Sequence, residues 1–258
     1  MSRKSQGQTK HLGASKPSSP ELAFWLEYAS LPACEIAVQL GYEAVILDLE
    51  HGVIGQEMAD VLTMTCKSIG LRVYSRVASA DRVPVQHALD SGADGVILPQ
   101  ITCLEEAREA TAYAKYPPLG TRGVGYNRTM KYDASTSRFF DAENKRSVCL
   151  PMIETAGALA EVEAILRLDT VDGVFVGPSD LSMMCGRGPF EATAEDLADF
   201  EKIASAAAKV GKIWGLPAPG QKIFDFAVQH HAALVTLSDD LTALRMGLAE
   251  GLAVVGGR

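Results

Sequence analysis

The chain has 258 residues, a net charge of −8 and 47% hydrophobic residues. This length and apolar content suffice for the core of one large α/β domain or of two small ones. The acidic balance and the lack of a long Lys/Arg run argue against nucleic acid as a partner. No run of about 18 apolar residues predicts a membrane-spanning helix, so we expect no membrane partner.

The first segment of the chain differs from the rest in composition. Residues 1–19 contain four basic residues and no acid, which predicts a disordered tail. They also lack the apolar stretch of a signal peptide. We therefore expect a single domain over residues 20–258. The five cysteines are odd in number and form no C-x-x-C pair, which favours reduced thiols and a cytoplasmic location.

From residue 21 onward, apolar strand-like runs alternate with amphipathic helix-like stretches. The expected strands are 22–26, 44–48, 71–76, 95–98, 147–152, 173–176, 212–216 and 233–237. The expected helices are 32–41, 56–69, 83–92, 104–114, 157–167, 195–210, 221–230 and 239–250. Such alternation is typical of βαβ units, and eight units predict an α/β fold of the (β/α)8 TIM-barrel type.

Two of the connections in this pattern are long. They cover residues 115–146 and 177–194. Connections of this length in a compact domain are often functional.

Carboxylates follow two neighbouring strands of the predicted barrel. Glu154 comes just after the run 147–152, and Asp180 follows the run 173–176. Adjacent parallel strands lie about 4.8 Å apart, so the two side chains can reach one ion. Two carboxylates would leave about four positions of an octahedral Mg²⁺ or Mn²⁺ open for water and substrate. In the alternative interpretation, each acid caps a helix.

A histidine follows the second strand. His51 comes directly after Asp48 and Glu50, which the alternation of a strand places on one face. A histidine in this position can accept a proton near neutral pH, whereas the alternative is a structural role.

An arginine and a glutamine end the next two strands. Arg76 either forms a salt bridge with Asp48 or Glu50, or binds a substrate carboxylate or enolate. Gln100 follows Leu98-Pro99 and either hydrogen-bonds substrate or a metal-bound water, or satisfies a turn.

A Schiff-base aldolase needs an inward-facing lysine at the carboxyl end of a strand. Lys212 opens its strand instead of ending it, and Lys131 lies in a predicted loop. We therefore identify no lysine that fits this role.

Three motifs together resemble the HpcH/HpaI family of class II pyruvate aldolases. They are Asp48-Leu49-Glu50-His51, Met152-Ile153-Glu154-Thr155 and Gly177-Pro178-Ser179-Asp180-Leu181-Ser182. The family includes 4-hydroxy-2-oxoheptanedioate aldolase and 2-dehydro-3-deoxyglucarate aldolase, and the resemblance extends from about residue 25 to 237. It implies a (β/α)8 barrel in which Glu154 and Asp180 hold a divalent metal, Mg²⁺, Mn²⁺ or Co²⁺.

The resemblance also implies roles for further residues. Pyruvate would chelate the metal, Arg76 would stabilise the enolate oxygen, and His51 would serve as the base with Asp90 as its partner acid. Backbone amides of Ser179 and Asp180 would hold the pyruvate carboxylate. The apolar residues implied to line the pocket are Trp25, Phe175 and Leu216.

Two further points follow from the resemblance. Family members usually assemble as homo-hexamers with exchanged C-terminal helices. Some members carry Gln two residues before the metal-binding Glu, where this chain has Met152.

We therefore expect a metal-dependent aldolase. It would make or cleave 4-hydroxy-2-oxo acids from pyruvate or hydroxypyruvate and an aldehyde, through a metal-stabilised enolate. One alternative is a CoA-thioester lyase of the citrate lyase β-subunit type, which the acidic balance disfavours. Another is a barrel that binds keto acids without catalysis.

Overall fold

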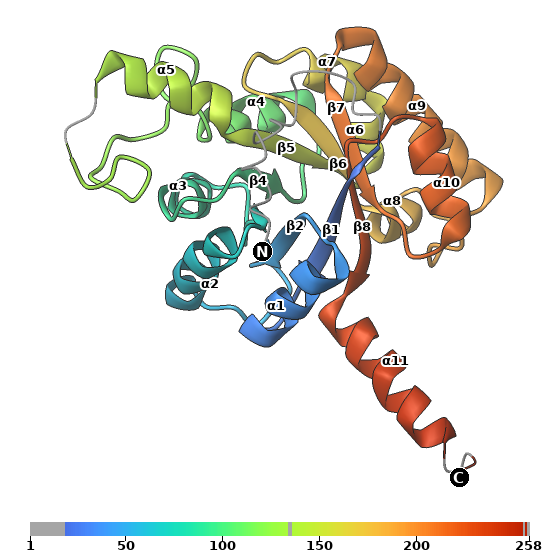
Figure 1. The fold of residues 1–258 in the computed structure, drawn as a ribbon. Coiled ribbons are helices and arrows are strands. Elements are labelled where there is room, and N and C mark those ends of the chain that lie inside the picture. Colours follow the sequence, from blue (N-terminus) through green and yellow to red (C-terminus); the bar gives the residue numbers. More distant parts are fainter. Residues whose placement is uncertain (1–18, 134–135, 255, 257–258) are drawn as a thin grey trace.

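Eight parallel strands close into one barrel in sequence order, with β8 pairing back to β1 (Figure 1). This computed structural model describes residues 19–133, 136–254 and 256. The strands are β1 (Glu21–Leu26), β2 (Ala44–Asp48), β3 (Arg72–Arg76), β4 (Gly95–Leu98), β5 (Val148–Ile153), β6 (Gly173–Val176), β7 (Ile213–Pro217) and β8 (Leu234–Asp239). The predicted (β/α)8 TIM barrel is confirmed. Of the predicted tail, residues 1–18 lie outside the described residues.

The described residues also form eleven helices. They are α1 (Leu31–Leu40), α2 (Gln56–Ser68), α3 (Arg82–Asp90), α4 (Leu104–Ala112), α5 (Ser137–Arg146), α6 (Ala156–Ala160), α7 (Val162–Leu166), α8 (Pro178–Met184), α9 (Ala194–Val210), α10 (Gln221–Gln229) and α11 (Asp240–Ala253). Figure 1 shows α11 projecting away from the barrel that the other helices surround. None of the helices described is both long enough and apolar enough to cross a bilayer.

The strand boundaries agree with the prediction to within two residues, whereas the helices differ in three places. The long connection 115–146 contains α5, and the connection 177–194 contains α8. The predicted helix 157–167 is interrupted at Glu161, which separates α6 from α7. The carboxylate of Glu161 accepts the backbone N–H of Leu104 at 2.6 Å, which ties this break to the start of α4.

Apolar side chains fill the barrel interior. Because successive strand residues point to opposite faces, one set of each strand packs inside and the other packs against the helices. The interior set comprises Ala23, Ala44, Ile46, Tyr74, Ile97, Val148, Leu150, Met152, Phe175 and Leu234. A filled interior leaves the carboxyl edge of the strands as the place where polar side chains can meet a substrate.

Candidate functional site

The loop that follows β2 folds around the buried carboxylate of Asp48. Asp48 is the last residue of the strand and is fully buried. Its Oδ1 accepts the backbone N–H of Glu50 at 3.0 Å and that of His51 at 3.1 Å. Burial would raise the pKa of Asp48, but hydrogen bonds and the charge of Arg76 outweigh it and lower this pKa. Asp48 is therefore a carboxylate that fixes the path of the loop.

Arg76 lies beside Asp48 because the two residues are partners in the register between β2 and β3. Its Nε donates to Asp48 Oδ1 at 3.0 Å, and its Nη2 donates to Oδ2 at 2.5 Å. Its Nη1 is 3.2 Å from Glu50 Oε2. Arg76 therefore forms the ion pairs with both acids that the sequence left open as an alternative, and this pairing holds the guanidinium rigidly at the edge of the barrel.

Trp25, on β1, packs over the ion pair of Asp48 and Arg76. Its Nε1 donates to Asp48 Oδ2 at 3.2 Å, and the Arg76 guanidinium carbon lies 4.9 Å from the centre of the indole ring. The indole also packs against Phe175, with ring centres 6.0 Å apart. Side chains from β1, β2 and β3 thus hold one another in fixed positions at the carboxyl edge of the barrel.

Glu154 follows β5 directly and is almost completely buried. Its Oε1 accepts the backbone N–H of Gln100 at 2.5 Å, and Gln100 adopts a positive φ of 58°. Its Oε2 is buried without a hydrogen-bond partner among the described residues. Burial raises the pKa of Glu154 to about 7, and the carboxylates of Glu50 and Asp180 add to this rise. The positive charge of Arg76 lowers this pKa, but by less than burial raises it.

Gly177 brings the end of β6 against Glu154. A Cβ at this position would lie 2.5 Å from Glu154 Oε2, so only glycine permits the approach. Pro178 is the first residue of α8, where its fixed φ suits a helix start. The turn that follows places Ser179 and Asp180 at the same edge as Glu154.

These side chains line one cavity of about 310 Å³. Its lining residues come from the carboxyl ends of β1, β3, β5, β6, β7 and β8 and from the segments that follow them. They are Trp25, Glu27, Arg76, Met152, Glu154, Gly177, Pro178, Ser179, Asp180, Phe190, Pro217, Pro219, Thr236, Leu237, Ser238 and Asp239. The structure thus brings together five of the predicted site residues: Trp25, Arg76, Glu154, Ser179 and Asp180.

Four other predicted site residues lie around this cavity without lining it. Phe175 is fully buried beneath Trp25 in the barrel interior. Leu216 packs in the layer between strands and helices, because the alternation of β7 turns Pro217 toward the cavity instead.

His51 lies at the rim of the cavity with 64% of its side chain exposed, and its Nε2 is 4.0 Å from Glu50 Oε2. Gln100 reaches the site through its backbone N–H alone.

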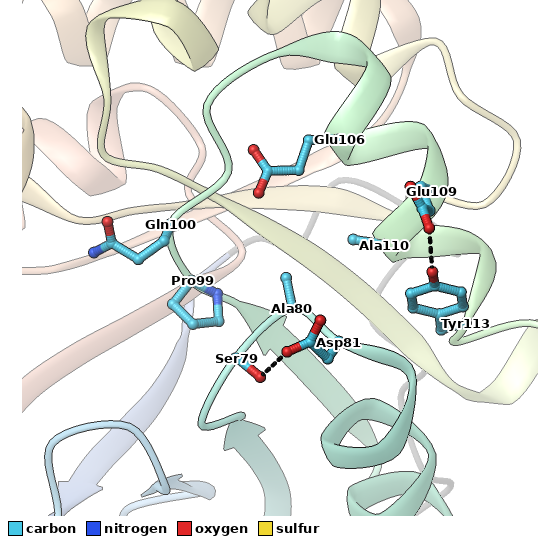
Figure 2. A pocket seen from close by; sticks show the side chains of 9 residues that line it. All are labelled: Ser79, Ala80, Asp81, Pro99, Gln100, Glu106, Glu109, Ala110 and Tyr113. Carbon is cyan, nitrogen blue, oxygen red and sulfur yellow. Dashed lines mark hydrogen bonds between the residues drawn. The ribbon is translucent and has the colours of Figure 1, made fainter.

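Gln100 also lines a second cavity of about 320 Å³ (Figure 2). This cavity lies between the start of α3 and one face of α4, and its remaining lining residues are Ser79, Ala80, Asp81, Pro99, Glu106, Glu109, Ala110 and Tyr113. Figure 2 shows two hydrogen bonds between these lining residues, from Ser79 to Asp81 and from Tyr113 to Glu109.

Asp90 lies at the opposite end of the barrel from His51. It is the last residue of α3, which runs from the carboxyl end of β3 to the amino end of β4. Its Oδ1 accepts hydrogen bonds from Arg122 at 2.5 Å and from Asn127 at 2.8 Å. Within one chain, the structure therefore separates the two residues that the resemblance pairs as base and partner acid.

A metal would have few protein ligands at this site. The described residues contain no group of three or more His, Cys, Asp or Glu side chains placed around a common point. Glu154 and Asp180 offer two carboxylates in one cavity, and the unpartnered Glu154 Oε2 is a donor atom that a cation would satisfy. This set fits an octahedral cation that keeps most of its positions for water and substrate.

Sequence reasoning assigned no site role to Asp48, Glu27 or Asp239. Asp48 positions both Arg76 and the His51 loop, and its place just before Glu50-His51 was the available signal. Glu27 and Asp239 line the cavity. Glu27 follows β1 and Asp239 ends β8, the first and last strands of the barrel. Only the closure of β8 onto β1 brings these two residues together.

Comparison with known proteins places this site in a family. The family model described as HpcH/HpaI aldolase/citrate lyase matches residues 21–217. A hydroxypyruvate/pyruvate aldolase of Sagittula stellata is 33% identical over 167 residues, which are 64% of this chain and 66% of that protein. A 4-hydroxy-2-oxo-heptane-1,7-dioate aldolase of Klebsiella pneumoniae is 31% identical over 93% of this chain and 91% of its own length.

The fold comparison agrees with the sequence comparison. The crystal structure of an HpcH/HpaI aldolase from Desulfitobacterium hafniense superposes with a TM-score of 0.85 at 27% identity, and the match covers 92% of this chain and 93% of that one. The chain belongs to the HpcH/HpaI aldolase/citrate lyase family.

Proposed function

We propose that this protein is an aldolase that cleaves or forms 4-hydroxy-2-oxo acids, with pyruvate or hydroxypyruvate as the 2-oxo acid and an aldehyde as the other product or substrate. The observation that carries the proposal is the shared cavity in which the unpartnered Glu154 Oε2, Asp180 and the fixed guanidinium of Arg76 meet. The two relatives described above are named as aldolases of such substrates.

Glu154 and Asp180 are the residues that would hold a divalent cation, with Mg²⁺, Mn²⁺ and Co²⁺ as candidates. Both side chains line the cavity, and oxygen ligands suit such ions. When bound, the cation supplies Lewis-acid stabilisation of charge on a substrate oxygen. Met152 also lines the cavity, so an apolar thioether lies beside Glu154.

Arg76 is suited to stabilise negative charge that develops on the substrate during the reaction. Its orientation is set before substrate arrives, because Asp48 and Glu50 hold it with contacts of 2.5–3.2 Å. A preorganised donor of this kind acts on the transition state without a cost in reorientation. The N–H groups of Ser179 and Asp180, at the first turn of α8, would hold the substrate carboxylate. Trp25, with the Phe175 ring packed behind it, would form an apolar surface of the cavity beside the substrate.

His51 would accept the proton of the substrate C4 hydroxyl during cleavage. It lies at the rim, where its exposed imidazole can reach a substrate that enters the cavity. Asp90 can act as its partner acid only if it comes from another copy of the chain, because within one chain the two lie at opposite ends of the barrel.

We propose further that the protein is a homo-oligomer, with the hexamer as the expected form. No described side chain of α11 is buried in the single chain. Leu241, Leu244, Leu248 and Leu252 form an apolar stripe along it, with exposures between 42% and 67%. A stripe of this size on a projecting helix is typical of a surface that another protein chain covers. The five free cysteines support a reducing compartment such as the cytoplasm.

The CoA-thioester lyase alternative finds less support in the cavity. Arg76 is the one cationic side chain among its lining residues, and Asp48 and Glu50 already balance its charge. The phosphate groups of CoA would therefore meet an acidic surface.

An activity assay tests the proposal and also distinguishes it from a barrel that binds keto acids without turnover. Purified protein is incubated with pyruvate and a panel of aldehydes, with Mg²⁺ or Mn²⁺ added and then removed by excess EDTA. We expect 4-hydroxy-2-oxo acid products with the metal and none with EDTA. Full activity in EDTA, or a lysine adduct trapped by borohydride in the presence of pyruvate, would contradict the proposal.

A further inference from the structure

The cavity has two acidic sides, and only one of them belongs to the proposed metal site. Glu154 follows β5 and Asp180 follows β6. Glu27 and Asp239 lie at the ends of β1 and β8, and both line the same cavity. Because the strands follow one another around the barrel in sequence order, β1 lies opposite β5 and its neighbour β8 lies opposite β4 across the mouth of the barrel. We call Glu27 and Asp239 the acidic wall.

Hydrogen bonds hold the acidic wall in place. The carboxylate of Asp240 accepts the backbone N–H of Glu27 at 3.1 Å and that of Tyr28 at 2.9 Å. Asp239 pairs with Trp25 in the register of β8 with β1, and its Oδ1 accepts the N–H of Thr242 at 2.7 Å. The segment after β1 is therefore tied to the start of α11, with Glu27 and Asp239 at the ends of neighbouring strands.

The charge of the acidic wall is not balanced by the residues that line the cavity. Arg76 is their one cationic side chain, and it is paired with Asp48 and Glu50. A divalent cation would offset the carboxylates of Glu154 and Asp180, which leaves the wall negative. The pKa of Glu27 is raised mainly by burial; the carboxylates of Asp239, Asp48 and Asp240 raise it further, and Arg76 lowers it by less. A substrate carboxylate in the same place would be disfavoured for the same reason.

We propose that the acidic wall makes this enzyme select uncharged, hydroxyl-bearing aldehydes as acceptors and disfavour aldehydes that carry a carboxylate. This inference rests on the proposed aldolase function. The wall also offers carboxylate oxygens, with the Ser238 hydroxyl beside them, as partners for an acceptor hydroxyl group.

The aldol step itself is redox-neutral. One C3 proton leaves pyruvate, a carbon–carbon bond forms between C3 and the aldehyde carbon, and the aldehyde oxygen gains a proton to become the C4 hydroxyl. With the 2-oxo acid held at Glu154 and Asp180 as proposed, the acceptor joined to C3 would extend toward the wall, which lines the other side of the same cavity. A carboxylate at its far end would therefore approach the wall. Two like charges at about 7 Å, with an effective dielectric constant of about 40, repel enough to lower the rate roughly 5–10-fold.

The test compares glycolaldehyde, which is uncharged and carries a hydroxyl, with succinic semialdehyde, which carries a carboxylate. The quantity measured is the ratio of kcat/KM for succinic semialdehyde to that for glycolaldehyde, at saturating pyruvate, with Mg²⁺ present and at low ionic strength. The variants are Glu27→Gln and Asp239→Asn, which remove one charge each and keep the side-chain shape. Asparagine also keeps the cap of α11.

We expect wild-type protein to favour glycolaldehyde by about tenfold or more, and each variant to raise the ratio roughly 3–10-fold. The preference should weaken as salt is added, because ions screen the wall. Glu201→Gln, an exposed charge change in the middle of α9, is the matched control and should leave the ratio unchanged. A wild-type preference for succinic semialdehyde, or a ratio that neither variant moves, would overturn the inference.

Deuterium exchange at C3 of pyruvate separates this inference from the function on which it rests. Exchange without an acceptor requires only the 2-oxo acid side of the site. If wild-type protein exchanges C3 protons but shows none of the expected acceptor ratios, the acidic wall inference fails and the aldolase proposal stands. If it neither exchanges nor turns over any aldehyde, both fail together.

Discussion

A single buried carboxylate, Asp48, determines the positions of several groups at the site. It accepts hydrogen bonds from Trp25, Arg76 and two backbone N–H groups of the loop that carries His51. A buried carboxylate with this many donors is stable as an anion. The residues that would touch substrate are therefore arranged by one that does not line the cavity.

Replacing Asp48 with asparagine should weaken both stability and activity. The new side chain would keep an oxygen for the loop N–H groups but would leave Arg76 with less negative charge around it. We expect Asp48→Asn to lower the free energy of unfolding by about 3 kcal/mol, as for other broken buried ion pairs, and to lower kcat/KM. Urea unfolding and an aldol assay measure the two effects. Asp225→Asn, an exposed position on α10, serves as the control and should change stability by less than about 0.5 kcal/mol.

His51 is exposed, so its loss should affect chemistry rather than folding. We expect His51→Ala to lower kcat by roughly 10²–10⁴, the range for a lost acid–base group, with little change in melting temperature. His87→Ala, an exposed histidine on α3, is the matched control. If kcat of His51→Ala stays within about threefold of wild type, the base lies elsewhere.

Glu154 should make the metal-free protein less stable at high pH. Burial raises its pKa from 4.5 to about 7 in the folded state. The folded protein therefore holds this proton more tightly than the unfolded chain, so the contribution of Glu154 to stability is greatest below pH 4.5 and is lost as the pH rises through about 7. The difference between these pKa values corresponds to about 3 kcal/mol.

Urea unfolding in EDTA at pH 5 and pH 8 checks this expectation for wild type and Glu154→Gln. The variant carries no ionisable group at this site, so we expect its stability relative to wild type to rise by about 2–3 kcal/mol between the two pH values. Glu21, whose pKa burial also raises to about 7, is present in both proteins and cancels in the comparison. Parallel pH profiles would show that Glu154 does not destabilise the protein in this way.

The residues at strand ends could be predicted because each follows an apolar run that marks its strand. This held for the positions of Arg76, Glu154 and Asp180, which all line the cavity. It was harder to predict which side chain near a strand end faces the cavity. A shift of one residue along β7 makes Pro217, and not Leu216, the residue that lines it. The resemblance pairs Asp90 with His51, whereas within one chain the folded barrel places the two at opposite ends.

At the level of elements, the strands were predictable and the additional helices were not. The strands are short, apolar and buried on both faces, which is a strong sequence signal. Helix α5 has few apolar residues and depends on tertiary contacts, with Phe139 and Phe140 packing on Tyr116. The seven-residue α8 begins within a Gly-Pro motif that is also typical of a turn.

The apolar stripe of α11 should mediate oligomer formation. In Leu244→Glu, a charge replaces the middle of the stripe, and we expect the assembly to dissociate toward monomers in light-scattering measurements. No described side chain of this helix is buried in the single chain, so the barrel should stay folded by circular dichroism. Ala243→Glu adds the same charge to the opposite face of α11 and is the control. Equal masses for wild type and Leu244→Glu would contradict this use of the stripe.

For the molecule as a whole, the closed barrel explains why residues from six strands converge on one cavity. Closure brings β8 beside β1, and with it Asp239 beside Trp25. The interior of the barrel is filled with side chains, so the cavity is confined to the carboxyl edge. Sequence periodicity predicts this architecture, whereas the composition of the cavity depends on loops that only the folded chain defines.

The central claim is that Glu154 supports metal-dependent enolate chemistry at this edge. Its most direct test is the exchange of the C3 protons of pyruvate for deuterium, followed by NMR in D₂O with no aldehyde present. We predict exchange by the wild-type protein with Mg²⁺, loss of exchange in excess EDTA with recovery when Mg²⁺ is restored, and no exchange by Glu154→Gln. Exchange at the wild-type rate in EDTA, or by Glu154→Gln, would contradict the account.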